Sequence, residues 1–165
     1  MTKARDESII LVVDDDQRFH AFADRVAARL GYACEHVRSG EEALRLLGTR
    51  SFRMLVLDGL LPGIRGEEVA RKTRERFSEE ELPILFCSAF YRDMRSFRHL
   101  MNECGVSRIL HKPVDEEQLL AVFKKLLEHE GEEEPPEPEE SAKLRGTYLT
   151  TSLERVDSMQ RILQA

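Results

Sequence analysis

Short runs of aliphatic residues recur along the chain, and each is closed by a polar residue. The run 9–13 is followed by three aspartates at 14–16, and the run 54–57 is followed by Asp58. A continuous apolar run of this length is typical of a strand that is buried on both faces, as in a parallel sheet. We therefore expect both sets of carboxylates to lie where strands end and the chain returns to water.

Between these runs, apolar residues return at intervals of three and four, which is the spacing of one face of a helix. The first such stripe ends at Leu30, and Gly31 supplies a left-handed stop. Two pairs, Ser39 with Glu42 and Asp115 with Gln118, have the spacing of a capping box and predict helix starts. The same reasoning predicts further strands at 32–37, 83–88 and 107–111, helices at 67–77, 94–104 and 116–127, and a loop rich in glycine and proline at 59–66.

Five strands that alternate with five helices predict an α/β fold with a parallel, doubly wound sheet. In such folds, ligands bind at the edge formed by the carboxyl ends of the strands. The chain of 165 residues is long enough to bury a substantial core, and its length suggests one compact domain.

The net charge of −6 is distributed unevenly. Residues 128–140 carry eight glutamates, three prolines and no Lys or Arg, which predicts an extended, disordered linker. We expect a domain at 1–128, a linker at 129–142 and a short tail at 143–165 that offers at most one amphipathic helix. Nothing resembles the basic footprint of a nucleic-acid-binding protein. The start of the sequence has neither a signal peptide nor a membrane span, so a cytoplasmic protein is expected.

The cysteines and histidines show no metal-binding spacing. The three cysteines are odd in number and never form a C-x-x-C pair, which predicts buried, reduced thiols and argues against disulfides or zinc. His111 precedes Lys112, but the alternation of side chains along a strand turns it away from that residue. No function is expected for the other four histidines: His20, His36, His99 and His129.

Four of the predicted strands end in residues that together suit phosphate chemistry. Asp14 with Asp15, Asp58, Ser88 and Lys112 should share one edge of the sheet. Carboxylates gathered there repel one another by roughly 1–4 kcal/mol per pair at about 4 Å, so a cation is needed. Oxygen ligands without Cys or His suit Mg²⁺. Lys112 and the Ser88 hydroxyl would add a positive charge and a hydrogen bond for a phosphoryl group, which predicts a phosphoryl-transfer site.

These residues resemble the CheY-like receiver domain of the response regulators in bacterial two-component systems, over roughly residues 8–128. The signature pieces occur in order on successive strand ends: V-V-D-D at 12–15, D-x-x-x-P-x-x-x-G at 58–66, Ser88-Ala89 and Lys112-Pro113. The resemblance implies the flavodoxin-like strand order 2-1-3-4-5, which the receiver fold itself exemplifies. It also implies a signalling switch that is no enzyme beyond its own phosphotransfer and dephosphorylation.

The resemblance assigns roles to the site residues. Asp58 would take a phosphoryl group from a histidine kinase or a phosphotransfer protein. Asp15, Asp58 and the backbone carbonyl of Leu60 would bind Mg²⁺, and Asp14 would act mainly through a water. Ser88 would follow the phosphoryl oxygen, Lys112 would pair with it, and the Lys112-Pro113 bond would be cis. The downstream protein partner is not implied, and a homodimer stays open; neither nucleic acid nor membrane is expected as a partner.

Some positions depart from the family pattern. Ile109 stands where receivers usually have Tyr or Phe, so there is no ring to move when Ser88 follows the phosphoryl group. Leu60 and Phe90, two residues beyond Asp58 and Ser88, are bulky and apolar at positions that influence access of the hydrolytic water. Ala89, beside Ser88, belongs to the same modulating segment.

Two alternative functions stay open. A receiver-like interaction module that does not depend on phosphorylation is favoured by Ile109 and disfavoured by the complete set of site residues. A haloacid-dehalogenase-like phosphatase would use Asp14 as nucleophile and Asp16 as acid, but it leaves Asp58 idle. For Asp16, a helix N-cap is the preferred interpretation.

The tail offers a further alternative. Residues 144–147 with 153–163 faintly resemble the opening of PATAN-type modules, in which case the chain would be the truncated start of a longer regulator. A docking helix or a flexible tail is the other interpretation.

Overall fold

The computed structural model describes residues 8–128, and the predicted linker 129–142 and tail 143–165 lie outside this range. The described part contains one five-stranded sheet, in which every pairing is parallel and the strand order is β2-β1-β3-β4-β5. The strands are β1 (Ile9–Val13), β2 (Ala33–Val37), β3 (Met54–Asp58), β4 (Ile84–Ser88) and β5 (Arg108–His111). The flavodoxin-like order predicted from the sequence is therefore confirmed.

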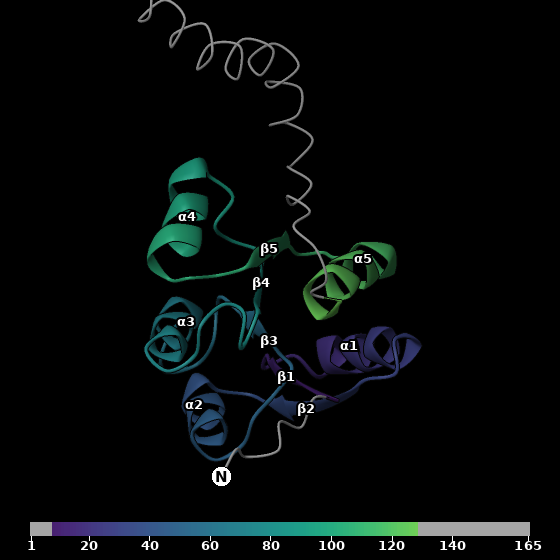
Figure 1. Ribbon diagram of the computed structural model, residues 1–165. Coiled ribbons are helices and arrows are strands. Elements are labelled where there is room, and N and C mark those ends of the chain that lie inside the picture. Colours follow the sequence, from purple (N-terminus) through teal and green to yellow (C-terminus); the bar gives the residue numbers. More distant parts are fainter. Residues whose placement is uncertain (1–7, 129–165) are drawn as a thin grey trace, which may run out of the picture. The chain divides into compact units, whose positions relative to one another are not determined.

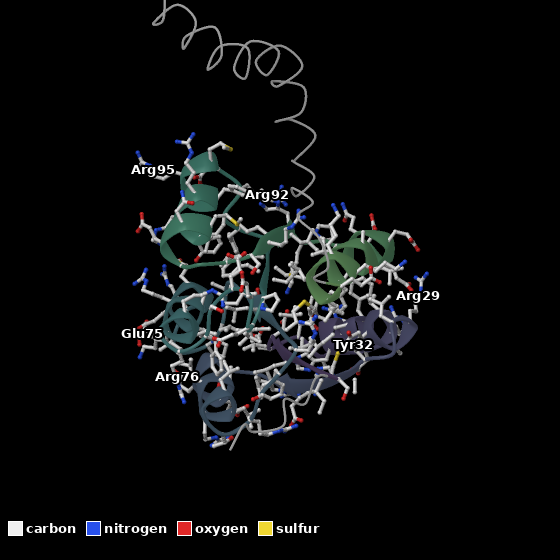
Figure 2. The ribbon with its side chains drawn as sticks, viewed as in Figure 1. Arg29, Tyr32, Glu75, Arg76, Arg92 and Arg95 are labelled. Atoms are coloured by element: carbon white, nitrogen blue, oxygen red, sulfur yellow. The ribbon has the colours of Figure 1, made fainter. Side chains whose placement is uncertain are left out.

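Helices cover both faces of the sheet (Figure 1). On one side lie α2 (Gly40–Thr49), α3 (Gly66–Arg74) and α4 (Met94–Arg98), which continues into a π-helical turn, η1 (His99–Glu103). On the other side lie α1 (Gln17–Arg29) and α5 (Glu116–Leu127). Charged side chains project outward from both helical layers, such as Arg29 on α1 and Glu75 and Arg95 on the opposite side (Figure 2).

Alternation along the strands divides the core into two clusters. In β1, Leu11 and Val13 belong to the cluster under α2 and α3, whereas Ile10 and Val12 belong to the cluster under α1 and α5. All four side chains are fully buried. The continuous apolar runs exist because each strand must contribute to both clusters, and this burial holds the strand ends in place.

The helix starts follow the sequence signals closely. Asp16 caps α1 by accepting a hydrogen bond from the Arg18 amide at 2.9 Å, which confirms the N-cap interpretation. Asp115 and Gln118 form the complete capping box of α5. At α2 only the Ser39 half forms in the described contacts, with the Glu42 amide at 3.3 Å.

The region 94–104 differs from the single regular helix that was expected. It begins as α4 and widens after Arg98 into η1, where the Cys104 amide donates to the carbonyl of His99 at 3.1 Å. In an α-helix of 3.6 residues per turn, residues five apart point about 140° away from each other. The wider π turn brings such residues onto one side, and π turns often occur at functional sites.

Candidate functional site

The carboxyl ends of the central strands lie level with one another at one edge of the sheet. The registers pair Val13 with Leu57, Asp58 with Cys87, and Ser88 with His111. The residues that end or follow these strands are therefore brought together: Asp14 and Asp15 after β1, Asp58 on β3, Ser88 on β4 and Lys112 after β5.

Three carboxylates form the acidic part of this site. Asp14 and Asp58 are buried and Asp15 is exposed, and one oxygen from each lies within 4.8 Å of the others. Burial raises the pKa of Asp58 to about 6; the charges of Asp14 and Asp15 add to this rise, and the Lys112 ammonium and the Leu60 amide oppose it. The ionised Asp58 carboxylate is therefore destabilised by its burial and by the neighbouring carboxylates.

Lys112 supplies the positive charge of the site. Its Nζ atom lies 2.5 Å from Asp14 Oδ2, 3.6 Å from Asp58 Oδ1 and 4.5 Å from the centre of the Phe19 ring. Burial disfavours the ammonium, but the hydrogen bond that Lys112 donates to Asp14 and the charges of Asp14 and Asp58 outweigh this effect and raise the pKa of Lys112. The Lys112-Pro113 peptide bond is cis, as predicted.

The donor set fits a hard divalent cation. One ammonium faces three carboxylates, so negative charge is in excess, and the only ligand atoms that this group offers are oxygens. Such sites suit Mg²⁺, which retains several waters and takes few protein ligands. The Leu60 amide donates to Asp58 Oδ1 at 3.4 Å. Its carbonyl as a cation ligand stays a prediction.

Ser88 ends β4 and is followed by Ala89 and Phe90. The Ser88 hydroxyl is buried and accepts a hydrogen bond from the Phe90 amide at 3.1 Å, and Ala89 is exposed. Leu60 and Phe90, two residues beyond Asp58 and Ser88, are 60% and 57% exposed and present hydrocarbon to solvent. Both were singled out from the sequence as modulators of water access.

Two glycines allow the loop after Asp58 to fold back on itself. A Cβ atom on Gly66 would lie 2.3 Å from the carbonyl oxygen of Asp58, and one on Gly59 would lie 2.8 Å from the Phe86 ring and 2.9 Å from Ser88 Oγ. The spacing D-x-x-x-P-x-x-x-G therefore has a steric reason, since α3 begins against the backbone of Asp58.

A tyrosine that sequence reasoning missed lies near Ile109. Ile109 is partly buried and packs against the cluster that contains Phe86, and the Tyr91 ring meets Phe86 edge-on at 5.4 Å. Tyr91 has a φ of 64°, which is uncommon for a residue with a side chain. Its hydroxyl donates to Glu67 on α3. No local sequence pattern predicts the position of Tyr91, because the residues that it contacts belong to other elements.

The histidines have more partners than their spacing suggested. His20 donates from Nε2 to the carbonyl of Asp14 at 2.6 Å, and its ring stacks on His36 at 4.5 Å. His20 thus supports the backbone of a site residue, a contact that the sequence analysis did not anticipate. His111 is exposed, and its Nε2 atom lies 3.1 Å from the Tyr91 carbonyl.

A second group of potential ligands was also missed. Glu67, His99 and Cys104 offer one ligand atom each within 4.8 Å of one another. The three cysteines are free thiols, as expected; Cys87 and Cys104 are buried, whereas Cys34, contrary to the expectation, is only partly buried. The spacing of the cysteines and histidines along the chain does not reveal this cluster, because it joins α3 to η1 and the residue that follows η1, which are distant in sequence.

Comparisons with known proteins agree with this geometry. Residues 10–124 match the family described as response regulator receiver domain. The chain is 36% identical over 128 residues to the response regulator MprA of Mycobacterium sp. (strain KMS). These aligned residues make up 78% of this chain and 54% of MprA. The chain thus spans about half the length of the curated relatives it matches.

Solved structures give the same result. The BeF₃-activated receiver domain of DrrB, a Thermotoga maritima OmpR/PhoB homologue, superposes with a TM-score of 0.63 at 29% identity, covering 73% of this chain and 97% of that one. A CheY-like receiver domain protein from Methanospirillum hungatei JF-1 superposes with a TM-score of 0.66 at 23% identity, covering 74% and 94%, and it supports the fold alone. Among the described residues, no helix is both long and apolar enough to cross a membrane.

Proposed function

Because this chain belongs to the response regulator receiver domain family of two-component signalling, we propose that it is a phosphorylation-dependent switch whose phosphoacceptor is Asp58. The observation that carries this proposal is the convergence of three carboxylates with Lys112 at one sheet edge. A cluster of this kind is useful where a dianionic phosphoryl group and a divalent cation meet.

In the proposed reaction, a carboxylate oxygen of Asp58 attacks the phosphorus of a phosphohistidine, and the bond from phosphorus to the histidine nitrogen breaks. Mg²⁺, held by Asp14, Asp15 and Asp58, would neutralise charge on the phosphoryl oxygens. Lys112 is near enough to Asp58 to pair with one of these oxygens. Ser88 would donate its hydroxyl to another. Later attack by water on phosphorus restores the Asp58 carboxylate.

Receiver domains act through partners, so a histidine kinase or a phosphotransfer protein would supply the phosphoryl group. The output would pass to a protein partner through a change at the surface, without catalysis on a second substrate. A homodimer is one such form of output.

The interaction module that does not use its phosphosite is the second candidate, because Ile109 leaves the usual aromatic position without a ring. The phosphatase alternative loses support. It requires Asp16 as the acid, but the Asp16 carboxylate caps α1 by accepting a hydrogen bond from the Arg18 amide.

Beryllofluoride distinguishes these candidates, and DrrB, a relative with a similar fold, is known in a BeF₃-activated form. With Mg²⁺ present, fluorine NMR should detect one bound complex on the wild type and none on Asp58→Asn. An amide NMR spectrum recorded in parallel should show shifts that extend beyond the site. Binding confined to the site without distant shifts would favour the interaction module, and binding to Asp58→Asn would overturn the proposal.

A further inference from the structure

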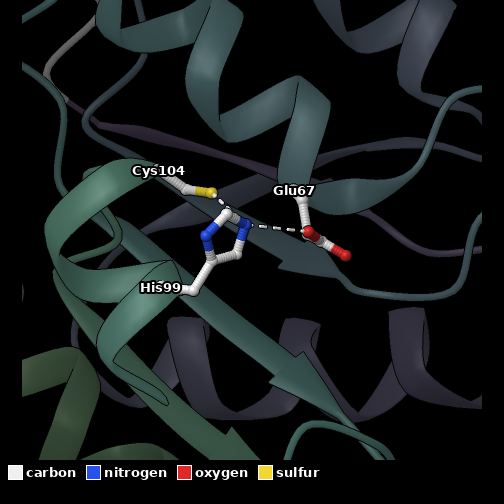
Figure 3. A group of neighbouring side chains, drawn as sticks. All are labelled: Glu67, His99 and Cys104. Atoms are coloured by element: carbon white, nitrogen blue, oxygen red, sulfur yellow. Dashed lines mark hydrogen bonds and ion pairs between the residues drawn. The ribbon is translucent and has the colours of Figure 1, made fainter. Parts of the chain in front are cut away.

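The group Glu67, His99 and Cys104 combines three different kinds of ligand atom away from the phosphosite. Glu67 lies in the first turn of α3, His99 begins η1, and Cys104 follows it (Figure 3). His99 Nε2 lies 3.2 Å from Glu67 Oε2 and 3.6 Å from Cys104 Sγ. None of the three belongs to the carboxylate cluster around Asp58.

These two separations match two edges of a tetrahedron around zinc. Zinc binds sulfur at about 2.3 Å, nitrogen at about 2.0–2.1 Å and carboxylate oxygen at about 2.0–2.2 Å, which places S and N about 3.6 Å apart and N and O about 3.4 Å apart. The observed separations are 3.6 Å and 3.2 Å. The ligand atoms of Glu67 and Cys104 lie within 4.8 Å of each other, so a cation between the three atoms could bind all of them after side-chain shifts.

The surrounding side chains prepare the ligand atoms. Glu103 Oε2 lies 3.0 Å from His99 Nδ1, which holds the proton on that nitrogen and leaves Nε2 free to bind a cation. The Tyr91 hydroxyl donates to Glu67 Oε1 and leaves Oε2 facing His99. Zinc-binding histidines usually donate their other ring N–H to an acceptor such as a carboxylate, and zinc-binding carboxylates usually accept a further hydrogen bond.

The backbone explains why His99 and Cys104 meet. Their separation of five residues would place them on different sides of an α-helix, but η1 closes through the hydrogen bond from the Cys104 amide to the His99 carbonyl. The irregular turn therefore directs both side chains toward α3.

An open hollow of about 600 Å³ adjoins the cluster and is lined by Glu67, His99, Tyr91 and Glu103, among others. It would admit a water as the fourth ligand. Burial raises the pKa of the Cys104 thiol, and the Arg71 guanidinium, 4.0 Å from Sγ, opposes that rise.

We propose that Glu67, His99 and Cys104 bind one zinc ion, with water as the fourth ligand. The thiol gives up its proton on binding, and the ion ties α3 to η1. Mixed S, N and O ligands favour zinc over Mg²⁺, which prefers oxygen alone, so the two sites of the molecule select different cations. Without the ion, the His99 ring lies between the carboxylates of Glu67 and Glu103.

Cobalt is the probe, because Co²⁺ occupies zinc sites and a thiolate ligand gives it a charge-transfer band in the near ultraviolet. The full chain, reduced and freed of metal, is titrated with Co²⁺ in excess Mg²⁺. We expect one equivalent to produce the thiolate band and tetrahedral absorption in the visible, and one equivalent of Zn²⁺ to abolish both.

Four variants make the test specific. His99→Gln and Cys104→Ser should each weaken binding at least tenfold, the lower end of what is lost when even a supporting contact is removed, and Cys104→Ser should also lose the thiolate band. Cys34→Ser, which removes a partly buried thiol elsewhere, and Asp58→Asn should keep both signals. Because Cys104 is fully buried, circular dichroism is used to check that Cys104→Ser still folds. His99 is partly exposed, so His99→Gln tests the site without changing a buried residue. Absence of the band in the wild type, or its survival in His99→Gln, would overturn the proposal.

Discussion

At the scale of single residues, the ionised carboxylate of Asp58 destabilises the folded chain. The buried carboxylate is more costly to ionise in the folded chain than in the unfolded one, and Lys112 offsets only part of that cost. A group with a raised carboxyl pKa reduces stability above its folded pKa and no longer does so below its ordinary value. A cation or a bound partner that neutralises the charge therefore stabilises the fold.

This predicts that Asp58→Asn stabilises the metal-free protein. The pKa rises from 3.8 to about 6, so at pH 7.5 the free energy of unfolding should increase by up to about 3 kcal/mol. At pH 5, where Asp58 is largely protonated, the difference should shrink, and saturating Mg²⁺ should stabilise the wild type alone. Urea unfolding at both pH values measures this; an Asn variant that is less stable at pH 7.5 would contradict it.

Leu60 and Phe90 should control how long the phosphorylated state lasts. A water must align with the bond from phosphorus to Asp58, and these exposed hydrocarbon side chains can neither orient it nor leave an open path. The double variant Leu60→Asn with Phe90→Glu should lose phosphate about tenfold faster, which corresponds to about 1.4 kcal/mol of barrier.

Phosphate release from the phosphorylated protein measures this rate. Met94→Glu is the matched control, because Met94 is an equally exposed apolar residue on α4; its lifetime should equal that of the wild type. An unchanged rate in the double variant would show that lifetime is set elsewhere.

At the scale of elements, the start of α3 determines where Asp58 lies. Gly66 packs directly on the Asp58 carbonyl, and its amide donates to Gly59 at 3.3 Å. On the neighbouring side, Glu41 of α2 accepts from the Ile64 amide at 3.1 Å and holds the same loop. The loop is thus fixed from two helices, although it lacks regular structure.

Gly66→Ala should therefore be destabilising, by about 1–3 kcal/mol as expected for overpacking, and should weaken Mg²⁺ binding by moving Asp58. Gly48→Ala in α2 should have the opposite sign, up to about 1 kcal/mol more stable, because its Cβ would meet only the flexible Arg76 side chain at 3.3 Å. Thermal unfolding and Mg²⁺ titration of both variants test this, and equal effects would refute the steric account.

Elements also show where sequence reasoning worked. The strands β1, β3 and β4 could be predicted because they are buried on both faces, and such burial requires a continuous apolar run. The widening of α4 into η1 was missed, since a π turn has no periodic signal. Tyr91 at positive φ was missed for a different reason: its side chain contacts Glu67 and Phe86, and Glu67 is distant in sequence.

At the scale of the whole molecule, the parallel sheet turns separate sequence positions into one site. Asp14, Asp58, Ser88 and Lys112 could be assigned to the same edge from the sequence, because each ends or follows a strand. The cluster of Glu67, His99 and Cys104 could not, since it joins a helix to a neighbouring irregular turn without any sheet to align them. Two groups of potential metal ligands with different chemistry thus lie on one fold, and only the carboxylate group follows from its topology.

The central claim is that Asp58 accepts a phosphoryl group in a reaction that needs Mg²⁺. The most direct measurement is intact mass spectrometry after incubation with acetyl phosphate. The wild type should gain one phosphoryl group with Mg²⁺ and none when EDTA is present, and Asp58→Asn should gain none under either condition. A phosphoryl group on Asp58→Asn, or equal modification of the wild type with and without Mg²⁺, would contradict the account.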